Sequence, residues 1–99
     1  MLMHIVSFKY HAGVDGDART HHRQRLQALS TLDGVIELKV GEDVVHSPRS
    51  FDTGLIIRFA DRAALDAYQK NPTHVPVAQL GVSLCEQIVA VDFEHPTDD

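Results

Sequence analysis

The sequence has a single cysteine, no long apolar run and few basic residues. The cysteine, Cys85, cannot form a disulfide within the chain, and its apolar neighbours predict a buried thiol without a catalytic role. A membrane-spanning helix needs a run of roughly 18 or more apolar residues, and the sequence has none. Residues 1–9 also lack the charged start and apolar stretch of a signal peptide. We therefore expect a soluble, cytoplasmic protein without membrane contact.

The charge balance is acidic, with 9 Lys and Arg against 14 Asp and Glu and a formal net charge of -5. This leaves no basic field for a phosphate backbone, so nucleic acid is not an expected partner. Basic residues do gather at Arg19, Arg23 and Arg25, but histidines and a glutamine separate them. Such a stretch is typical of one solvated helix face.

The length of 99 residues is common for one domain and too short for two independent cores. An apolar fraction of 43% with 23% charged residues is ordinary for a globular protein and argues against disorder. We expect a single domain over residues 1–95 and a short acidic tail over residues 96–99. Because so small a domain buries limited surface, self-association is a common way to bury more.

Hydrophobic periodicity divides the chain into strands and helices. Residues 2–10 alternate between two semi-apolar sides, which is typical of a strand. The stripe of Ala18, His22 and Leu26 has the spacing of an inward helix face. The predicted order is strand 2–10, helix 17–31, strand 35–40, a long loop at 45–52, strand 53–59, helix 62–70 and strand 82–93.

The segment 74–80 contains Pro76, which excludes a central strand, and we expect one irregular turn there. Two strand-helix-strand halves in series then predict an α+β domain with a four-stranded antiparallel sheet and both helices on one face. The other face still carries apolar side chains such as Met3 and Ile5. An uncovered semi-apolar sheet predicts a second copy of the chain as partner.

Five segments, in order along nearly the whole chain, carry a family resemblance. They are HIVSFKY at residues 4–10, LDGV at 32–35, VGEDV at 40–44, FDTGLIIRFADRAALDAYQKNPTHV at 51–75 and QIVAVDFE at 87–94. With these segments the chain resembles the stress-responsive dimeric α/β-barrel (Dabb) domain family. The resemblance implies a ferredoxin-like βαββαβ fold and a homodimer in which two sheets pack face to face as a dimeric α/β barrel.

Plant polyketide cyclases of the olivetolic-acid type, within this family, carry a first-strand histidine, a second-helix tyrosine and a histidine after that helix. Here the pattern falls on His4, Tyr68 and His74, which the resemblance implies as a candidate catalytic site. A cyclase acting on a poly-β-keto chain removes a proton from carbon and stabilises the oxyanion that forms. We expect His74 to be the base, Tyr68 the donor to the oxyanion, and His4 the residue that orients His74 or the ligand.

Two departures from the plant cyclases predict a more polar pocket and a different ligand. Inward positions of the first helix include His22 and Arg25 rather than aromatic residues, and Asn71 replaces the first histidine of an HPxH motif. Val6 and Phe8 lie on the same side of the first strand as the candidate site. We therefore expect a small carbonyl-bearing or aromatic, polyketide-like ligand in contact with Val6, Phe8, His22, Arg25 and Asn71.

Other interpretations fit the same residues. An inward tyrosine on a helix and a histidine on a strand are common in plain cores, as in a non-catalytic, stress-associated dimeric module. Related dimeric barrels also host cofactor-free monooxygenases, by analogy of fold alone. A hydrophobic cavity between the sheet and the helices that reaches solvent near His74 would favour the enzyme, and one closed by Phe8, Leu65 and Leu84 would favour the module.

No metal or cofactor is expected, although the chain has 7 histidines. No HxxxH spacing on a helix face or HxH spacing on a strand occurs, and the adjacent His21 and His22 diverge on a helix. His11, His46 and His95 fall in loops or at ends and are expected to be solvated.

Overall fold

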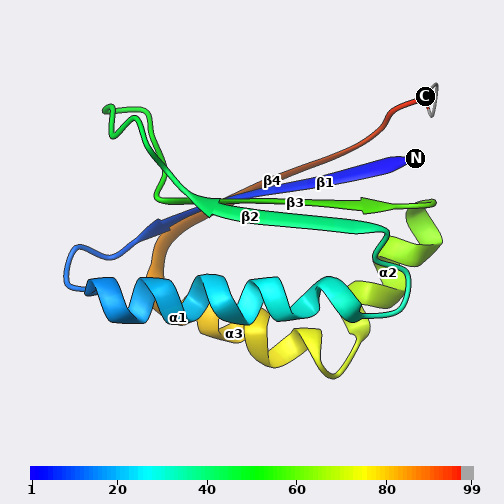
Figure 1. Cartoon of the computed structure of the whole chain (residues 1–99), viewed down its shortest axis with the longest axis horizontal. Coiled ribbons are helices and arrows are strands. Elements are labelled where there is room, and N and C mark those ends of the chain that lie inside the picture. The colour runs from blue at the N-terminus through cyan, green and yellow to red at the C-terminus, as the bar shows by residue number, and fades with distance from the viewer. Residues whose placement is uncertain (97–99) are drawn as a thin grey trace.

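A four-stranded antiparallel sheet with three α-helices on one side makes up residues 1–96, the part of the chain described by the computed structural model (Figure 1). The strand order is β2-β3-β1-β4, which confirms the predicted α+β architecture. In chain order the elements are β1 (Leu2–Tyr10), α1 (Gly16–Gln27), the 3₁₀ helix η1 (Ala28–Thr31), β2 (Glu37–Glu42), β3 (Thr53–Phe59), α2 (Arg62–Lys70), α3 (His74–Leu84) and β4 (Cys85–Glu94).

The central strand β1 alternates strictly between the two faces of the sheet. Its even-numbered residues are buried against the helices, and its odd-numbered residues are half-buried on the opposite face. Because successive side chains of a strand point to opposite sides, the alternation in the sequence sets this orientation. The even-numbered side joins the core, which consists of Leu2, Val6, Phe8, Tyr10, Leu26, Leu29, Leu38, Leu55, Ile57, Phe59, Leu65, Tyr68, Val77 and Cys85.

Aspartate side chains begin the first two helices. Asp15 accepts a hydrogen bond from the Ala18 backbone N–H at 2.8 Å, and Asp61 accepts one from the Ala64 N–H at 2.9 Å. Each carboxylate satisfies an N–H that has no partner within its helix and lies at the positive end of the helix dipole. The predicted helix at 17–31 corresponds to α1 followed directly by η1.

The expectation of an irregular turn at residues 74–80 is wrong, because this segment begins the helix α3. Pro76 is the third residue of α3. The first N–H groups of a helix have no intrahelical acceptor, so proline is tolerated there. The proline therefore excluded a strand without excluding a helix. As a result three helices rather than two cover the sheet, and β4 begins at Cys85 rather than at residue 82.

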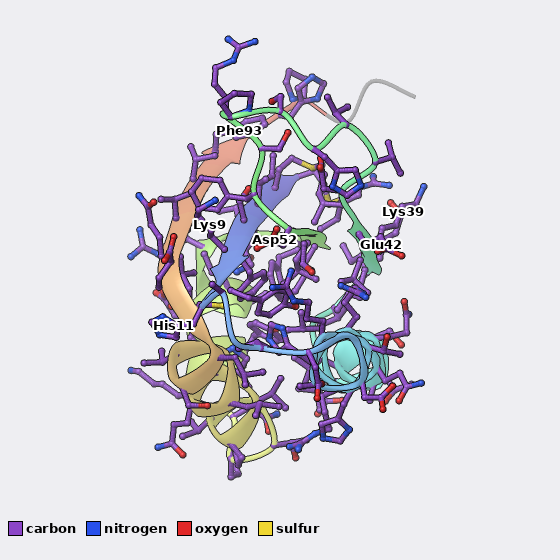
Figure 2. The ribbon with its side chains drawn as sticks, turned by 90° about the vertical axis from the view of Figure 1, so that its left-hand side faces the viewer. Lys9, His11, Lys39, Glu42, Asp52 and Phe93 are labelled. Carbon is purple, nitrogen blue, oxygen red and sulfur yellow. The ribbon has the colours of Figure 1, made fainter. Side chains whose placement is uncertain are left out.

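The opposite face of the sheet, called the open face below, has no cover within residues 1–96. Figure 2 shows α1 and α3 beside one another on the helix side of the sheet. The apolar side chains of the open face are Met3, Ile5, Ile56, Val89, Val91 and Phe93. Of these, Val91 is 54% exposed and Phe93 is 41% exposed.

None of the helices in residues 1–96 is long and apolar enough to span a membrane. Most of the predicted acidic tail, residues 97–99, lies outside the described part of the chain.

Candidate functional site

The fold brings the three predicted catalytic residues together. Tyr68, on α2, lies between the other two, with its ring centroid 4.4 Å from that of His74 and 6.3 Å from that of His4. His4 comes from β1, and His74 is the first residue of α3. His4, which lies 64 and 70 positions before the other two residues in the sequence, therefore joins them in one cluster of two imidazoles around a phenol.

A fourth member of the cluster, Asp92 on β4, was not predicted. His4 and Asp92 are direct cross-strand neighbours, and the Nδ1–H of His4 donates to the Asp92 carboxylate. This bond fixes the histidine tautomer and leaves Nε2 with a lone pair when the ring is neutral. The sequence shows the acid within an apolar strand, but only the register between β1 and β4 places it opposite His4.

The turn between α2 and α3 positions His74. Asn71 ends α2 by donating its N–H to the Tyr68 carbonyl at 3.1 Å, and its own carbonyl accepts the His74 N–H at 2.9 Å. The His74 ring then donates from Nδ1 to the Gln69 carbonyl at 3.2 Å, which leaves Nε2 as the basic nitrogen. Partial burial lowers the pKa of His74 below its ordinary value of 6.5, while the hydrogen bond to the Gln69 carbonyl opposes this shift and His4 adds a smaller lowering.

Tyr68 is held as a neutral hydrogen-bond donor. The side chain is buried, and this burial raises the pKa of Tyr68 to about 12. Within residues 1–96 its hydroxyl makes no hydrogen bond, although the ring packs against Phe59 with centroids 5.1 Å apart. The hydroxyl oxygen is also not completely buried, since the completely buried side-chain polar atom without a partner in residues 1–96 is His22 Nε2. Tyr68 is therefore a neutral phenol whose proton no described residue binds.

Two surface hollows of about 280 Å³ each border the cluster. One is mainly apolar and is lined by His74 together with Val75, Ala78 and Val82 of α3. The other lies between α2 and β4 and includes Asp92. The side chain of Gln69 borders both hollows. The hollow beside His74 reaches solvent but lies along α2 and α3 rather than between the sheet and the helices, and neither of the two hollows is lined by His4 or Tyr68.

His22 lies in a separate cluster at the other end of β1. Its Nδ1 is 2.7 Å from the Tyr10 hydroxyl, which is also 2.9 Å from Thr53 Oγ1. Arg23 donates to the same Thr53 oxygen at 3.2 Å. His22 is fully buried, and its Nε2, packed towards Gly81, has no hydrogen-bond partner among residues 1–96. Tyr10 and Thr53 were not predicted as members of a polar cluster.

The remaining predicted ligand contacts are not gathered around the trio. Val6 and Phe8 are buried core residues, and the Phe8 ring packs edge-on against His22. Arg25 is half-buried on α1 and makes no ion pair within residues 1–96. Asn71 shapes the turn before His74. Of these five residues, Asn71 is the one whose contacts belong to the trio.

The chemistry available at the trio is proton transfer. Each imidazole has its Nδ1–H engaged by an acceptor, and the phenol between them carries a proton that no described residue binds. Such an arrangement offers a base and a hydrogen-bond donor within one small site. No group of three or more His, Cys, Asp and Glu side chains in residues 1–96 has the geometry of a metal site.

The sheet and its helix layer define a small ferredoxin-like domain of the kind that forms α/β barrels. The chain belongs to the stress responsive A/B barrel domain family, whose profile matches residues 2–95. No curated protein matches the chain.

Several solved structures share the fold. A dimeric ferredoxin-like protein of unknown function from Thermobifida fusca is 20% identical, with a TM-score of 0.87 over 95% of this chain and 90% of that chain. Another such protein, from Jannaschia sp., is 28% identical, with a TM-score of 0.80 over 95% and 98%. A hydroxynitrile lyase from Passiflora edulis is 17% identical, with a TM-score of 0.87 over 99% and 95%.

Proposed function

We propose that the protein is a homodimeric, cofactor-free enzyme that makes or breaks a carbon–carbon bond next to a carbonyl group of a small aromatic or polyketide-like molecule. The observation that carries this proposal is the neutral Tyr68 phenol, unbonded within residues 1–96 and packed between two imidazoles. The reaction class is that of a cyclase or a lyase.

The same three groups serve either direction of the reaction. In a cyclisation, His74 Nε2 removes a proton from the carbon next to a carbonyl, the enolate attacks a second carbonyl, and the resulting alkoxide takes the proton back. In a lyase reaction, His74 removes the hydroxyl proton, the carbon–carbon bond breaks to give a carbonyl, and the proton passes to the leaving carbanion. Tyr68 donates a hydrogen bond to the oxygen in both cases.

Positioning in the proposed site depends on His4 and Asp92. The Asp92 carboxylate holds the His4 ring by its Nδ1–H, and the His4 ring meets the edge of Tyr68. We assign to His4 the orientation of Tyr68 and the ligand, while the apolar hollow beside His74 receives the hydrocarbon part of the molecule. A hollow of about 280 Å³ has room for a single aromatic ring or a short alkyl chain.

Two relations support this class of reaction. A fold neighbour is a hydroxynitrile lyase, and such an enzyme breaks a carbon–carbon bond next to an oxygen. The His4, Tyr68 and His74 pattern resembles that of olivetolic-acid-type cyclases, and these residues meet in one cluster here.

Homodimer formation through the open face is part of the proposal. Fold neighbours from Thermobifida fusca and Jannaschia sp. are dimeric proteins. The open face carries Val91 and Phe93 in partly exposed positions, and monomeric proteins rarely leave a contiguous apolar patch of this kind in water.

Turnover of two probes tests the reaction class, namely mandelonitrile for the lyase direction and a linear β-keto thioester for the cyclase direction. His74→Gln is expected to lower kcat of the active direction by about 10²–10⁴-fold, because it removes the base. His46→Gln is the matched control, since His46 lies in the exposed β2–β3 loop. Unchanged turnover of His74→Gln would contradict the assignment. Saturable binding of both probes without turnover would instead identify a non-catalytic binding module.

A further inference from the structure

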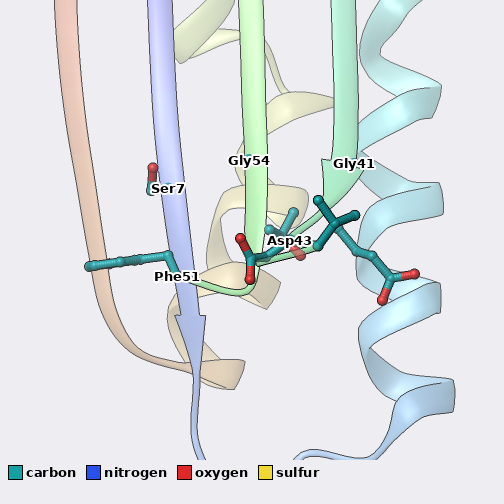
Figure 3. Close-up of a pocket in the computed structure, with 8 residues that line it drawn as sticks. Ser7, Gly41, Asp43, Phe51 and Gly54 are labelled. Atoms are coloured by element: carbon teal, nitrogen blue, oxygen red, sulfur yellow. The ribbon is translucent and has the colours of Figure 1, made fainter. Parts of the chain in front are cut away.

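A hollow of about 450 Å³ lies on the open face, on the wrong side of the sheet for the trio. Its floor is formed by Ser7, Gly41 and Gly54 on neighbouring strands (Figure 3). The even-numbered side chains of β1, His4 among them, point to the opposite side, where the helices lie. A molecule that reacts at the trio therefore approaches through the two hollows on the helix side.

Gln69 marks the boundary between these two hollows, because it is the residue common to both linings. His74 lines one hollow, and Asp92, which holds the His4 ring, lines the other. Tyr68 lies between the rings of His4 and His74, and so it lies beneath this boundary. The way from one hollow to the other thus passes over the trio.

The backbone of Gln69 is fixed, whereas its side chain is free. The Gln69 carbonyl accepts the Nδ1–H of His74 at 3.2 Å, and the residue directly follows Tyr68 in α2. The residue is exposed, and within residues 1–96 its side-chain amide makes no hydrogen bond. Exposed side chains change rotamer within nanoseconds. The amide can therefore move aside without disturbing the groups beneath it.

The two hollows differ in the kind of group they favour. The hollow beside His74 is mainly apolar, whereas the carboxylates of Asp92 and Glu94 border the other. Arg62 also borders this second hollow, but its Nε–H donates to Asp66 at 2.9 Å. An anionic group would meet like charges there. The second hollow therefore favours a polar group without negative charge.

We propose that Gln69 determines substrate specificity as a movable divider between the two hollows. The inference rests on the proposed function and names its substrate class, an elongated, uncharged carbonyl compound. The hydrocarbon part lies in the hollow beside His74, and the reacting carbonyl lies over Tyr68 at the boundary. A neutral polar end, such as an ester or thioester, lies in the hollow beside Asp92. The substrate reaches this position by pushing the Gln69 side chain aside.

Binding of two probes to the full-length protein tests the divider, with the Kd taken from NMR shifts of the His74 ring. Benzaldehyde fits one hollow, and ethyl benzoylacetate spans both. Gln69→Ala should lower the Kd of the ester about tenfold and leave that of benzaldehyde unchanged, since each further methylene that leaves water raises affinity about fourfold. Gln69→Leu keeps the bulk and should not tighten the ester. Gln79→Ala is the matched control, because Gln79 borders the hollow beside His74 but not the boundary.

A third probe, the benzoylacetate carboxylate, tests the preference for an uncharged end. The wild type should bind the ester at least about tenfold more tightly than the carboxylate. Glu94→Gln should reduce this ratio about threefold, because it removes one of the two acids at the hollow. Glu86→Gln is the control, since Glu86 is an exposed acid at the other end of β4. Equal Kd values for ester and carboxylate in the wild type would contradict the neutral end.

The outcomes separate failure of the divider from failure of the proposed function. Saturable shifts with an ester Kd that is the same in the wild type and Gln69→Ala would overturn the divider and leave the site standing. Equal tightening by Gln79→Ala would also overturn it. No saturable shift with any probe would overturn the divider and the proposed function together. An unchanged His22 ring signal shows that a variant keeps its fold, because His22 packs at the other end of β1.

Discussion

Acid sensitivity is expected from the buried His22 ring. Burial lowers the pKa of His22 from 6.5 to about 4, with smaller contributions from the neighbouring positive charge of Arg23 and from His21. In the unfolded chain His22 titrates at its ordinary value. The unfolded state therefore takes up a proton below pH 6.5, whereas the folded state does not do so until about pH 4.

The size of the effect follows from this difference in pKa. Each pKa unit corresponds to about 1.4 kcal/mol, so the free energy of unfolding should fall by roughly 3 kcal/mol between pH 7 and pH 4 because of this residue. The contribution is absent above pH 7, where His22 is neutral in both states. A loss of this size is a large fraction of the stability of a small domain.

The assay is urea unfolding at a fixed protein concentration across pH 4 to 7, for the wild type and His22→Gln. Glutamine keeps a hydrogen-bonding group near the Tyr10 hydroxyl but cannot titrate. The variant is expected to show a shallower pH dependence by roughly 3 kcal/mol over this range. His21→Gln is the matched control, because His21 is the exposed neighbour on the same helix. Equal pH dependence in the wild type and His22→Gln would refute the reasoning.

Three further substitutions test individual contacts. Gly81→Ala would place its Cβ 3.2 Å from His22 Nε2, so the free energy of unfolding in urea should fall by about 1 kcal/mol. Gly16→Ala is the control, because its Cβ would meet no described atom within 4 Å, and it should be neutral or stabilising. Tyr68→Phe should reduce turnover at least tenfold yet change the unfolding free energy by less than about 1 kcal/mol, since no described residue bonds the hydroxyl. A loss of unfolding free energy well above about 1 kcal/mol would instead mark the hydroxyl as structural. Asp92→Asn should alter the ¹⁵N shifts of the His4 ring, and unaltered shifts would show that the carboxylate does not set the tautomer.

Much of the fold follows from local patterns in the sequence. The alternation of β1 and the capping aspartate of α2 gave the bounds of these elements as the structure has them. The helix at residues 74–84 was harder to predict, because its apolar residues show no clear helical face and Pro76 argues against a central strand but not against a helix. The third helix depends on packing against the rest of the domain, and tertiary contacts of this kind leave little trace in a short window.

Those site residues could be predicted that a family pattern of residue types indicates. Residues whose role depends on the pairing register of the strands could not. The resemblance to family members indicated His4, Tyr68 and His74, and the structure gathers them. Asp92 was missed because its role depends on the pairing of β1 with β4. His22 was expected at the ligand because it points inward, but an inward direction does not say which end of the sheet a residue occupies.

Ligand response of the histidine rings tests the central claim most directly. The ring signals of the full-length protein are followed by NMR during titration with benzaldehyde and with a small β-keto acid, after assignment by His4→Gln and His74→Gln. The account predicts saturable shifts at His4 and His74, with little change at the sealed His22 or the exposed His46. Shifts confined to exposed histidines, weak and alike for every compound, would contradict a ligand site at this cluster.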